Sequence, residues 1–400
     1  MKAELVTEGL EPTLGAWELP PELVMLRDTV RRFMNEEIKP EEDKVQHNAY
    51  KLPPDVLARL QAKSKAIGLW CVQSPVQYGG AGLPLLAQAI FAEEAAKCRM
   101  GLYIGGCGAF GFDPPLVIFD STRLHIEKYG IPAVKRGGKS FVAITEPSGG
   151  ADPARAIRTK AEKKGDRYIL NGQKIFISGA NEAPWGLCFA RTGHGGGGGI
   201  SCFIIETDKP GYEARPFDVI RSWSPCVVTF TDYEVPEENL VGIENRGFDV
   251  CQKWLVHARI PYSAATIGVA QAALEMAIEW ARERKTFGST LAEKQNIQWM
   301  LADSEIELRA ARLLVYQAAW NGELGRDIKV DASVAKVYAT EAAGRVVDRC
   351  IQIFGGLGVS AELPLERWYR ELRIRRIGEG PSEVHRMVLA RSMLSGRTQN

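Results

Sequence analysis

The sequence predicts an α+β protein of several domains: an N-terminal helical domain, a central antiparallel β-sheet or barrel, and a C-terminal four-helix bundle. The apolar residues recur with a helical period near both ends of the chain and with a period of two in its middle. At 400 residues, the chain is also too long for one ordinary core. The expected domains are residues 1–137, 138–245 and 246–400.

The first domain is expected to be helical. In LVMLRDTVRRFMNEEI, the apolar Leu23, Leu26, Val30 and Phe33 recur at helical spacing. A second helix is predicted in PPDVLARLQAKSKAIGL, which begins with prolines suited to a first helical turn. The glycines of QYGGAGL then mark a loop before a third helix, LLAQAIFAEEAAK.

From about Lys139 to Pro236 the sequence has the pattern of strands. Runs rich in β-branched and aromatic residues, such as RYILNGQKIFIS and CVVTFTDYEV, are separated by turn-forming residues, among them KGD, NG and the glycines of GHGGGGG. No helical pattern of useful length interrupts these runs. This favours an antiparallel sheet or barrel and argues against a Rossmann dinucleotide domain, in which strands and helices alternate.

From about Gly247 the helical period returns in three long amphipathic stretches, which begin with IGVAQAAL, IQWMLADS and DASVAKVY. Within the second stretch, one face is formed by Leu301, Ser304, Leu308, Ala311 and Val315. Long helices joined by short connections predict an antiparallel four-helix bundle.

The composition excludes several classes of protein. A formal net charge of +1 gives no electrostatic reason to expect a nucleic-acid partner. The eight cysteines are scattered, without a CxxC pair or a nearby histidine, so we expect neither a metal site nor a disulfide scaffold. No apolar run is long enough to cross a bilayer, and MKAELVTEGLEPTLG has no signal or transit pattern. A cytoplasmic protein without membrane association is therefore expected.

Several motifs are compatible with chemistry, although each also has a purely structural explanation. In RRIGEGPSEVHR, Glu379 stands between two glycines, which permit unusual backbone dihedrals, so it is either a solvated turn residue or a catalytic base. In ITEPSGGAD, the Thr145 hydroxyl and the glycine-rich backbone could bind a polar cofactor, or form an ordinary hairpin loop. In NGQKIFISGA, which is expected to start at a turn, Phe176, Ile177 and Ser178 could flank a flat ring, or form a half-buried strand.

Two further motifs lie in the helical C-terminal part. The connection ERKTFGSTLAEKQ offers Arg284 and Phe287 for pairing or stacking with an anionic ligand, and Gln295 for its amide. A simple helical hairpin would explain the same residues. The glycines of QIFGGLGV suit the end of a helix without any ligand.

Taken together and in this order, the motifs closely resemble those of the acyl-CoA dehydrogenase family over essentially the whole chain. The matching stretches are LWCVQSPVQYGGAGL, TEPSGGAD, GDRYILNGQKIFIS, ARERKTFG, QIFGGLGV and IGEGPSEVHRMVLAR. The GEGPSEVH form of the last motif is most similar to an outlying subgroup. The resemblance implies the acyl-CoA dehydrogenase fold, which agrees with the three blocks inferred from periodicity.

The resemblance also implies FAD, bound non-covalently between the sheet and the C-terminal bundle, with the Ser178 hydroxyl near flavin N5. The positions that match the family's flavin-facing loop and strand are Ile144, Thr145, Gly150, Ala151, Phe176, Ile177 and Ser178. The positions that match residues reaching the FAD of a neighbouring subunit are Arg284, Phe287, Gln295, Gln352, Gly355 and Gly356. A homo-oligomer, with a homotetramer as its expected form, follows from the second set.

In this family resemblance, Glu379 matches the general base. It would remove the α-proton of an acyl-CoA thioester while flavin N5 accepts the β-hydride, giving the trans-2-enoyl-CoA and passing electrons to an electron-transferring flavoprotein. The base's own backbone N–H and a ribityl hydroxyl of FAD would stabilise the enolate. Some members place their base on an earlier helix, but the corresponding residue here is Ala258. Arg259 matches a family arginine near the base, and Ala151, Gly378 and Gly380 are further expected substrate contacts.

The chain departs from the family pattern at several positions. Ala151 replaces a usual serine, and Pro381 and Glu383 replace the Thr and Gln that commonly touch FAD. Gly378 replaces a usual aromatic residue, which would leave room for branched, cyclic or aryl acyl groups unless another side chain fills the gap. Two alternatives on the same fold are an acyl-CoA lyase such as a desulfinase, and a flavin monooxygenase or oxidase. The presence of Glu379 argues against both.

Overall fold

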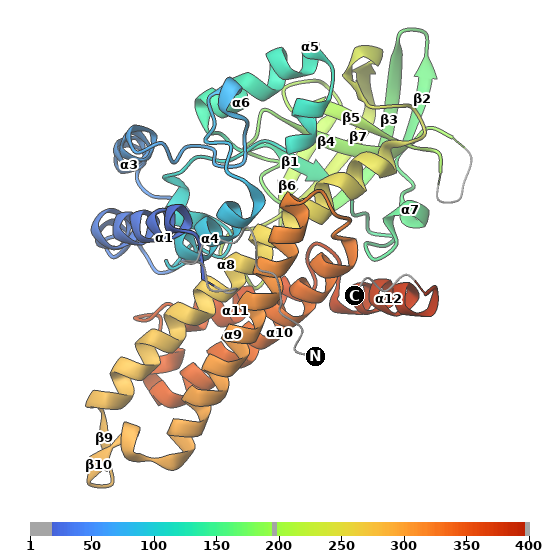
Figure 1. The fold of residues 1–400 in the computed structure, drawn as a ribbon. Coiled ribbons are helices and arrows are strands. Elements are labelled where there is room, and N and C mark those ends of the chain that lie inside the picture. Colours follow the sequence, from blue (N-terminus) through green and yellow to red (C-terminus); the bar gives the residue numbers. More distant parts are fainter. Residues whose placement is uncertain (1–17, 194–197, 397–400) are drawn as a thin grey trace, which may run out of the picture.

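The computed structural model describes residues 18–193 and 198–396, and it confirms the predicted order of helices, sheet and helices (Figure 1). The β-sheet lies at one end of the molecule. Three long C-terminal helices run side by side away from it. No helix in the described ranges is long and apolar enough to span a membrane.

The N-terminal helices bury the residues that the periodicity selects. They are α1 (Pro21–Phe33), α2 (Lys39–Glu42), α3 (Pro54–Ala66), α4 (Leu85–Ala95), α5 (Arg123–His125) and α6 (Ile131–Arg136). In α1, Val30 and Phe33 are buried, while Leu23 and Leu26 are half-buried. Helix α4 is buried on almost every side because it packs against α1 and against the C-terminal helices. Helices α1 and α4 pack along the flank of the C-terminal helices, whereas α5 and α6 lie beside the sheet.

The central sheet has the strand order β6-β7-β3-β2-β4-β5-β8. Its elements are β1 (Phe141–Ala143), α7 (Pro153–Ala156), β2 (Lys160–Lys164), β3 (Arg167–Ile177), β4 (Trp185–Arg191), β5 (Ile200–Glu206), β6 (Tyr212–Pro216), β7 (Cys226–Pro236) and β8 (Leu240–Val241). Most neighbours pair antiparallel, as expected, but β1 pairs parallel with β4, and β2 meets β4 in one parallel pair. Strands β4 and β5 are buried almost throughout because both faces of the sheet are covered there.

The prediction of a turn at Asn171-Gly172 is wrong, because both residues lie inside the eleven-residue strand β3. The pairing of β3 with β7 shifts register between Leu170 and Gly172, as at a β-bulge. Asn171 Nδ2 donates to Asp232 Oδ1 at 3.0 Å, and the Asp232 N–H donates to Asn171 Oδ1 at 2.9 Å. A Cβ on Gly172 would lie 2.6 Å from Thr159 Oγ1, so this glycine serves a close approach of two chain segments. Residues 194–197 of the GHGGGGG loop are outside the described residues.

The C-terminal part is helical, as predicted. Its elements are α8 (Gly247–Glu283), β9 (Lys285–Thr286), β10 (Ser289–Thr290), α9 (Gln295–Glu323), α10 (Lys329–Phe354), α11 (Leu365–Arg375) and α12 (Ser382–Leu394). The predicted inner face of α9 is confirmed, since its members from Ser304 to Val315 are buried and Leu301 is half-buried. The β9–β10 hairpin lies at the tip farthest from the sheet (Figure 1). We call the connection between α8 and α9, with the end of α10 beside it, the tip.

A buried ion pair fastens the loop after β1 to the sheet. The fully buried side chain of Lys174, in β3, donates from Nζ to Glu146 Oε1 at 2.8 Å and to the Phe189 carbonyl at 2.6 Å. Glu146 also accepts the backbone N–H groups of Arg158 and Thr159, at 2.7 and 3.0 Å. The carboxylate of the TEPSGGAD motif is therefore committed to holding its own loop in place.

We predict that Lys174→Met destabilises the protein by about 3–5 kcal/mol, because it leaves Glu146 buried without its counter-ion. The check is the urea midpoint of unfolding followed by circular dichroism. The Lys174→Met/Glu146→Leu double variant should recover part of the loss. The matched control Lys163→Met, which removes one member of an exposed pair with Glu237, should leave the midpoint nearly unchanged. Equal losses in the two single variants would contradict this role.

Candidate active site

Glu379 lies in a strained turn between α11 and α12. Its φ of 57° is in the left-handed region, which non-glycine residues rarely adopt, and Gly380 follows with φ 95°. A Cβ on Gly380 would lie 3.0 Å from His385 Nε2, so a side chain at this position would be both strained and crowded. The second glycine of the GEG motif is thus required by the backbone itself.

Side chains from three helices hold the two carbonyls of this turn. Arg259 Nε, in α8, donates to the Glu379 carbonyl at 3.1 Å, and His385 Nε2, in α12, contacts the same oxygen at 3.2 Å. Lys336 Nζ, in α10, donates to the Gly380 carbonyl at 2.7 Å. Such a set of contacts can maintain a conformation that costs about 1–3 kcal/mol on its own. We call the side chains of Arg259, Lys336 and His385 the clamp. Arg259, predicted to lie near Glu379, is therefore one of three residues that hold this turn.

Glu379 is half-buried, and one oxygen of its carboxylate, Oε2, is shielded from solvent. Its Oε2 has no hydrogen-bond partner among the described residues. Burial raises the pKa of Glu379 above its usual range, although the nearby charges of Arg259, Arg375 and Lys336 oppose this effect. Burial also lowers the pKa of Lys336 to about 8, so its ammonium group is still mostly charged at neutral pH.

A tyrosine hydroxyl lies beside Gly378, where the sequence suggested open space for the acyl group. A Cβ on Gly378 would lie only 2.8 Å from the Tyr262 hydroxyl oxygen, which belongs to a side chain of α8. The same hydroxyl donates to the Arg375 carbonyl at 3.4 Å. The space expected beside Gly378 is therefore partly taken by a tyrosine from another helix, whose hydroxyl lies where a side chain at this position would begin.

The end of β3 presents an aromatic ring and a hydroxyl. Phe176 has φ 63° and is 58% exposed, with its ring edge-on to Phe217. Ser178 Oγ accepts a hydrogen bond from Arg221 Nη2 at 2.5 Å. The Ile177 side chain instead points into the sheet core and cannot flank a ligand. An exposed ring next to a half-buried hydroxyl and a buried guanidinium fits a flat, polar cofactor.

The loop after β1 lies beside this strand end. Ile144 and Thr145 are half-buried, and the Thr145 carbonyl accepts the Ile175 N–H at 2.9 Å. Gly150 and Ala151 are exposed, and a Cβ on Gly150 would lie 3.0 Å from Thr145 Cγ2. The loop and the strand predicted to face the cofactor are therefore neighbours in the structure.

Tyr103 connects the strand end to the region of Glu379, and sequence reasoning missed it. The Arg221 guanidinium lies 4.5 Å from the centroid of its ring, and the Arg375 guanidinium lies 4.7 Å from it. Arg221 contacts Ser178, and the charge of Arg375 acts on Glu379. Because these residues come from separate parts of the chain, no local motif could have linked them.

The chain is similar to known proteins along most of its length. Three family models match the chain: the N-terminal, middle and C-terminal domains of acyl-CoA dehydrogenase, at residues 20–119, 142–232 and 245–394. A short-chain-specific acyl-CoA dehydrogenase of Clostridium acetobutylicum is 33% identical, over 94% of this chain and 98% of that protein.

The chain belongs to the acyl-CoA dehydrogenase family.

The family's members are flavoprotein oxidoreductases, so the family, the fold and the enzyme class expected from the sequence are confirmed. The 3-(aryl)acrylate reductase of Clostridium sporogenes is 34% identical over 92% of this chain and 98% of that protein. The butyryl-CoA dehydrogenase structure from Megasphaera elsdenii has a TM-score of 0.84 at 30% identity, covering 95% of this chain and all of that one. The FAD complex of PigA, at 23% identity, shares the fold with a TM-score of 0.86.

The remaining family positions for FAD lie far from Glu379 in the same chain. Arg284, Phe287, Gln295, Gln352, Gly355 and Gly356 are all exposed and belong to the tip. Phe287, with φ 50°, is fully exposed. At about 1.5 Å per residue, α8 spans roughly 36 Å between Arg259 and Glu283. One chain therefore does not bring the two predicted sets of cofactor residues together. The two other predicted cofactor contacts, Pro381 and Glu383, lie close to Glu379. Pro381 directly precedes α12, and Glu383 is exposed in the first turn of that helix.

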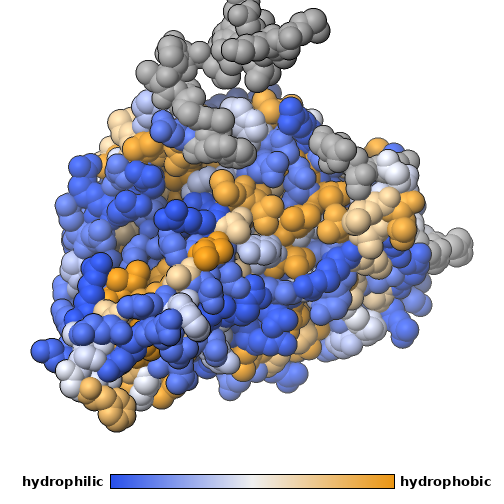
Figure 2. All heavy atoms as spheres, turned by 60° about the horizontal axis from the view of Figure 1, so that its bottom comes forward, coloured by the Kyte–Doolittle hydropathy of each residue, from blue (hydrophilic) through white to orange (hydrophobic). Residues whose placement is uncertain are grey.

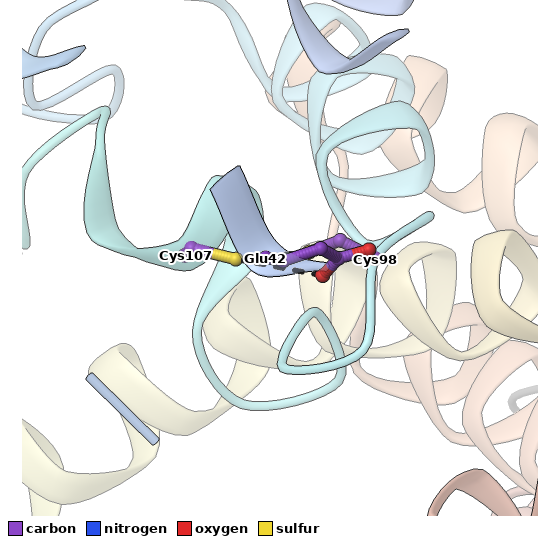
Figure 3. Close-up of side chains that lie close together, drawn as sticks. All are labelled: Glu42, Cys98 and Cys107. Carbon is purple, nitrogen blue, oxygen red and sulfur yellow. Dashed lines mark hydrogen bonds between the residues drawn. The ribbon is translucent and has the colours of Figure 1, made fainter. Parts of the chain in front are cut away.

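A second polar cluster is buried in the N-terminal domain (Figure 3). The sulfur atoms of Cys98 and Cys107 are 3.8 Å apart, and Cys107 Sγ lies 3.7 Å from Glu42 Oε2. The same oxygen accepts the Arg99 N–H at 2.7 Å. Burial raises the pKa of Glu42 to about 7. Sequence reasoning missed this group because Cys98 and Cys107 do not have the spacing of a metal-binding motif, and Glu42 is far from both in the sequence.

We predict that Lys336→Met raises the pKa of Glu379 further. The ammonium group favours the ionised carboxylate, so its removal should move the titration to higher pH. The pKa can be read from the carboxyl band in the infrared spectrum, with Glu379→Gln to assign it. Arg345→Met, an exposed change on the same helix, serves as the control. An unshifted titration in Lys336→Met would show that this charge does not act on Glu379.

Proposed function

We propose that this chain is an FAD-dependent acyl-CoA dehydrogenase that converts an acyl-CoA thioester to the trans-2-enoyl-CoA, with Glu379 as the base that removes the α-proton. The observation that carries the proposal is the Glu379 carboxylate itself. Its Oε2 is shielded from water and has no partner among the described residues, and burial raises the pKa of the carboxyl group. A general base works best when its pKa approaches that of the proton it removes.

The chain also offers a donor for the thioester carbonyl. The backbone N–H of Glu379 has no acceptor among the described residues, although its carbonyl has two contacts. In the left-handed turn, this N–H and the carboxylate belong to one rigid residue, so both can face one substrate. Hydrogen bonding to the carbonyl stabilises the enolate that forms when the α-proton leaves.

Thr145, Phe176 and Ser178 are the residues we propose to hold the flavin against the sheet. FAD, when bound, supplies the acceptor for the β-hydride. Family membership and the PigA complex of the same fold support this cofactor. The protein's own part is to place the substrate's α-carbon at Glu379 and to exclude water from it.

We further propose an electron-transferring flavoprotein as the redox partner. A chain solved in work on the electron transferring flavoprotein of Acidaminococcus fermentans supports this, at 32% identity and a TM-score of 0.84 over 95% of this chain. The similarity to the 3-(aryl)acrylate reductase supports a second candidate, the reverse reaction, in which Glu379 would return a proton to the α-carbon. The eight cysteines are all free and buried thiols, which supports a reducing, cytoplasmic location.

The enzyme is proposed to act as a homo-oligomer, with a tetramer as its expected form. Along α9, Trp299, Ile306, Leu313 and Trp320 are each at least half exposed and recur every seventh residue, opposite the buried face. Figure 2 shows apolar residues gathered in patches on the face that it turns forward. A regular apolar stripe suits a second copy of the same chain. A second copy could also bring its tip to the cofactor that this chain holds at the sheet.

Glu379→Gln should keep FAD and bind acyl-CoA, yet reduce its flavin at least roughly 10²–10⁴-fold more slowly, because the amide cannot accept the proton. Anaerobic rapid mixing with a panel of acyl-CoA thioesters measures the rate by loss of flavin absorbance. Near-wild-type bleaching would make Glu379 only a turn residue. Release of a leaving group without net flavin reduction would favour a lyase, and a requirement for dioxygen would favour a monooxygenase.

Arg284→Ala should lower both the FAD content and the fraction of assembled protein, because the tip is proposed to contact a neighbouring subunit's cofactor. Flavin absorbance per chain and light scattering after size exclusion measure the two quantities. Arg282→Ala, an exposed arginine in the last turn of the same helix, is the matched control. Full flavin content with unchanged assembly in Arg284→Ala would count against the shared site.

A further inference from the structure

Arg375, the last residue of α11, is a buried guanidinium without a dedicated anion. It is 4% exposed and lies 3.8 Å from the centroid of the Tyr262 ring. Its Nη1 donates to the Tyr262 carbonyl at 3.2 Å, and its Nε has no partner among residues 18–193 and 198–396. Arg375 forms no salt bridge within the described part of the chain, and arginine cannot shed its charge to escape this cost.

Arg375 also lies against the ring of Tyr103, where two more donors among the described residues lack a hydrogen-bond partner. Arg221, 8% exposed, lies against the Tyr103 ring as Arg375 does. Within the described part of the chain, neither the Arg221 Nε nor the buried Tyr103 hydroxyl has a hydrogen-bond partner. Because buried polar groups almost always find partners, three unpaired donors around one aromatic ring point to an acceptor that arrives with a ligand.

The protein's own carboxylates do not supply that acceptor. Glu371 is the acidic residue nearest this group in the helix, and its Oε1 already accepts from Arg367 Nε at 3.1 Å and from the Ser222 N–H at 3.3 Å. Its Oε2 is buried without a partner among the described residues, so it too makes no hydrogen bond with the three unpaired donors. Glu379 must stay free to take a proton. The three guanidinium groups of Arg221, Arg367 and Arg375 therefore outnumber the two carboxylates on which their charges act, Glu371 and Glu379.

The position of the charge relates it to the acyl part of the substrate. Arg375 is close enough to Glu379 for its charge to act on the base, and Tyr262, on which it stacks, abuts Gly378. In the proposed reaction, a substrate whose α-carbon meets Glu379 would have its acyl group close to these side chains. A planar guanidinium is suited to a carboxylate, which it can bind through two parallel hydrogen bonds.

We propose that the acyl group of the substrate ends in a carboxylate, and that Arg375, assisted by the Tyr103 hydroxyl and Arg221, binds it. This inference rests on the proposed dehydrogenase function and narrows its substrate class to thioesters of dicarboxylic acids. The carboxylate would replace the missing partners and neutralise the excess charge. A methyl-ended acyl chain would instead leave all three donors buried and unpaired, at a cost in affinity.

The decisive experiment compares matched pairs of thioesters on the wild-type, FAD-loaded enzyme. Succinyl-, glutaryl- and adipyl-CoA are set against 4-methylpentanoyl-, 5-methylhexanoyl- and 6-methylheptanoyl-CoA, in which an isopropyl group replaces the carboxylate. Binding is measured by calorimetry on Glu379→Gln, and flavin bleaching on the wild type. At least one dicarboxylic thioester should be preferred over its partner by roughly 10²-fold or more, since sites built for a polar group reject analogues that lack it.

Variants assign the preference to its residue. Arg375→Met should abolish most of the preference, and Tyr103→Phe should reduce it, while FAD content reports whether each variant is folded and loaded. Arg373→Met, an exposed change on the same helix, should leave the preference intact. The wild-type comparison decides the question even if Arg375→Met does not fold.

The outcomes separate this inference from the function on which it rests. If flavin is bleached and methyl-ended thioesters are bound as well as or better than their partners, the dehydrogenase stands and the carboxylate is wrong. If dicarboxylic thioesters bind through Arg375 without any bleaching, the anion site stands and the dehydrogenase falls. Loss of FAD from Arg375→Met with no preference in the wild type would assign the arginine to the cofactor and overturn the proposal.

Discussion

The strained turn at Glu379 and Gly380 exists only because three helices close on its carbonyls. Arg259, Lys336 and His385 come from α8, α10 and α12, and none of them could hold the turn without the packing of those helices. The bundle is therefore more than a scaffold: its core fixes the backbone of one residue. The clamp also leaves the carboxylate and the N–H of Glu379 free, since it engages the carbonyls alone.

The charge balance around this turn works against folding. Because burial raises the pKa of Glu379 in the folded protein, its contribution to stability is present when the carboxyl is protonated, below its unfolded pKa, and is lost as the pH rises through the folded pKa. Above its unfolded pKa, Glu379 thus weighs against the fold, and the opposing charges of Arg259, Arg375 and Lys336 limit this cost. Sites that need reactive groups commonly give up stability in this way.

The sequence predicts the architecture and the place of Glu379 because both are local. Apolar periodicity identifies α1 and α9, and the GEG motif identifies a residue whose backbone must be unusual. The Asn171-Gly172 pair shows where local sequence patterns stop being sufficient. The same two residues can form a hairpin turn or a β-bulge, depending on the chain segment that packs opposite them. Tyr262 taking part of the space beside Gly378, and Arg221 meeting Tyr103, depend on packing between distant segments, which no single stretch specifies.

The length of α8 has a genetic consequence. It separates the residues around Glu379 from the tip, so in a shared site a lesion at the tip would damage the cofactor of a neighbour and leave its own base intact. Two chains with different defects, one at Phe287 and one at Glu379, could then restore an intact centre when they assemble together. An oligomer assembled from both variants would therefore recover part of the activity. A variant altered only at the tip would lower the activity of the unaltered subunits with which it assembles.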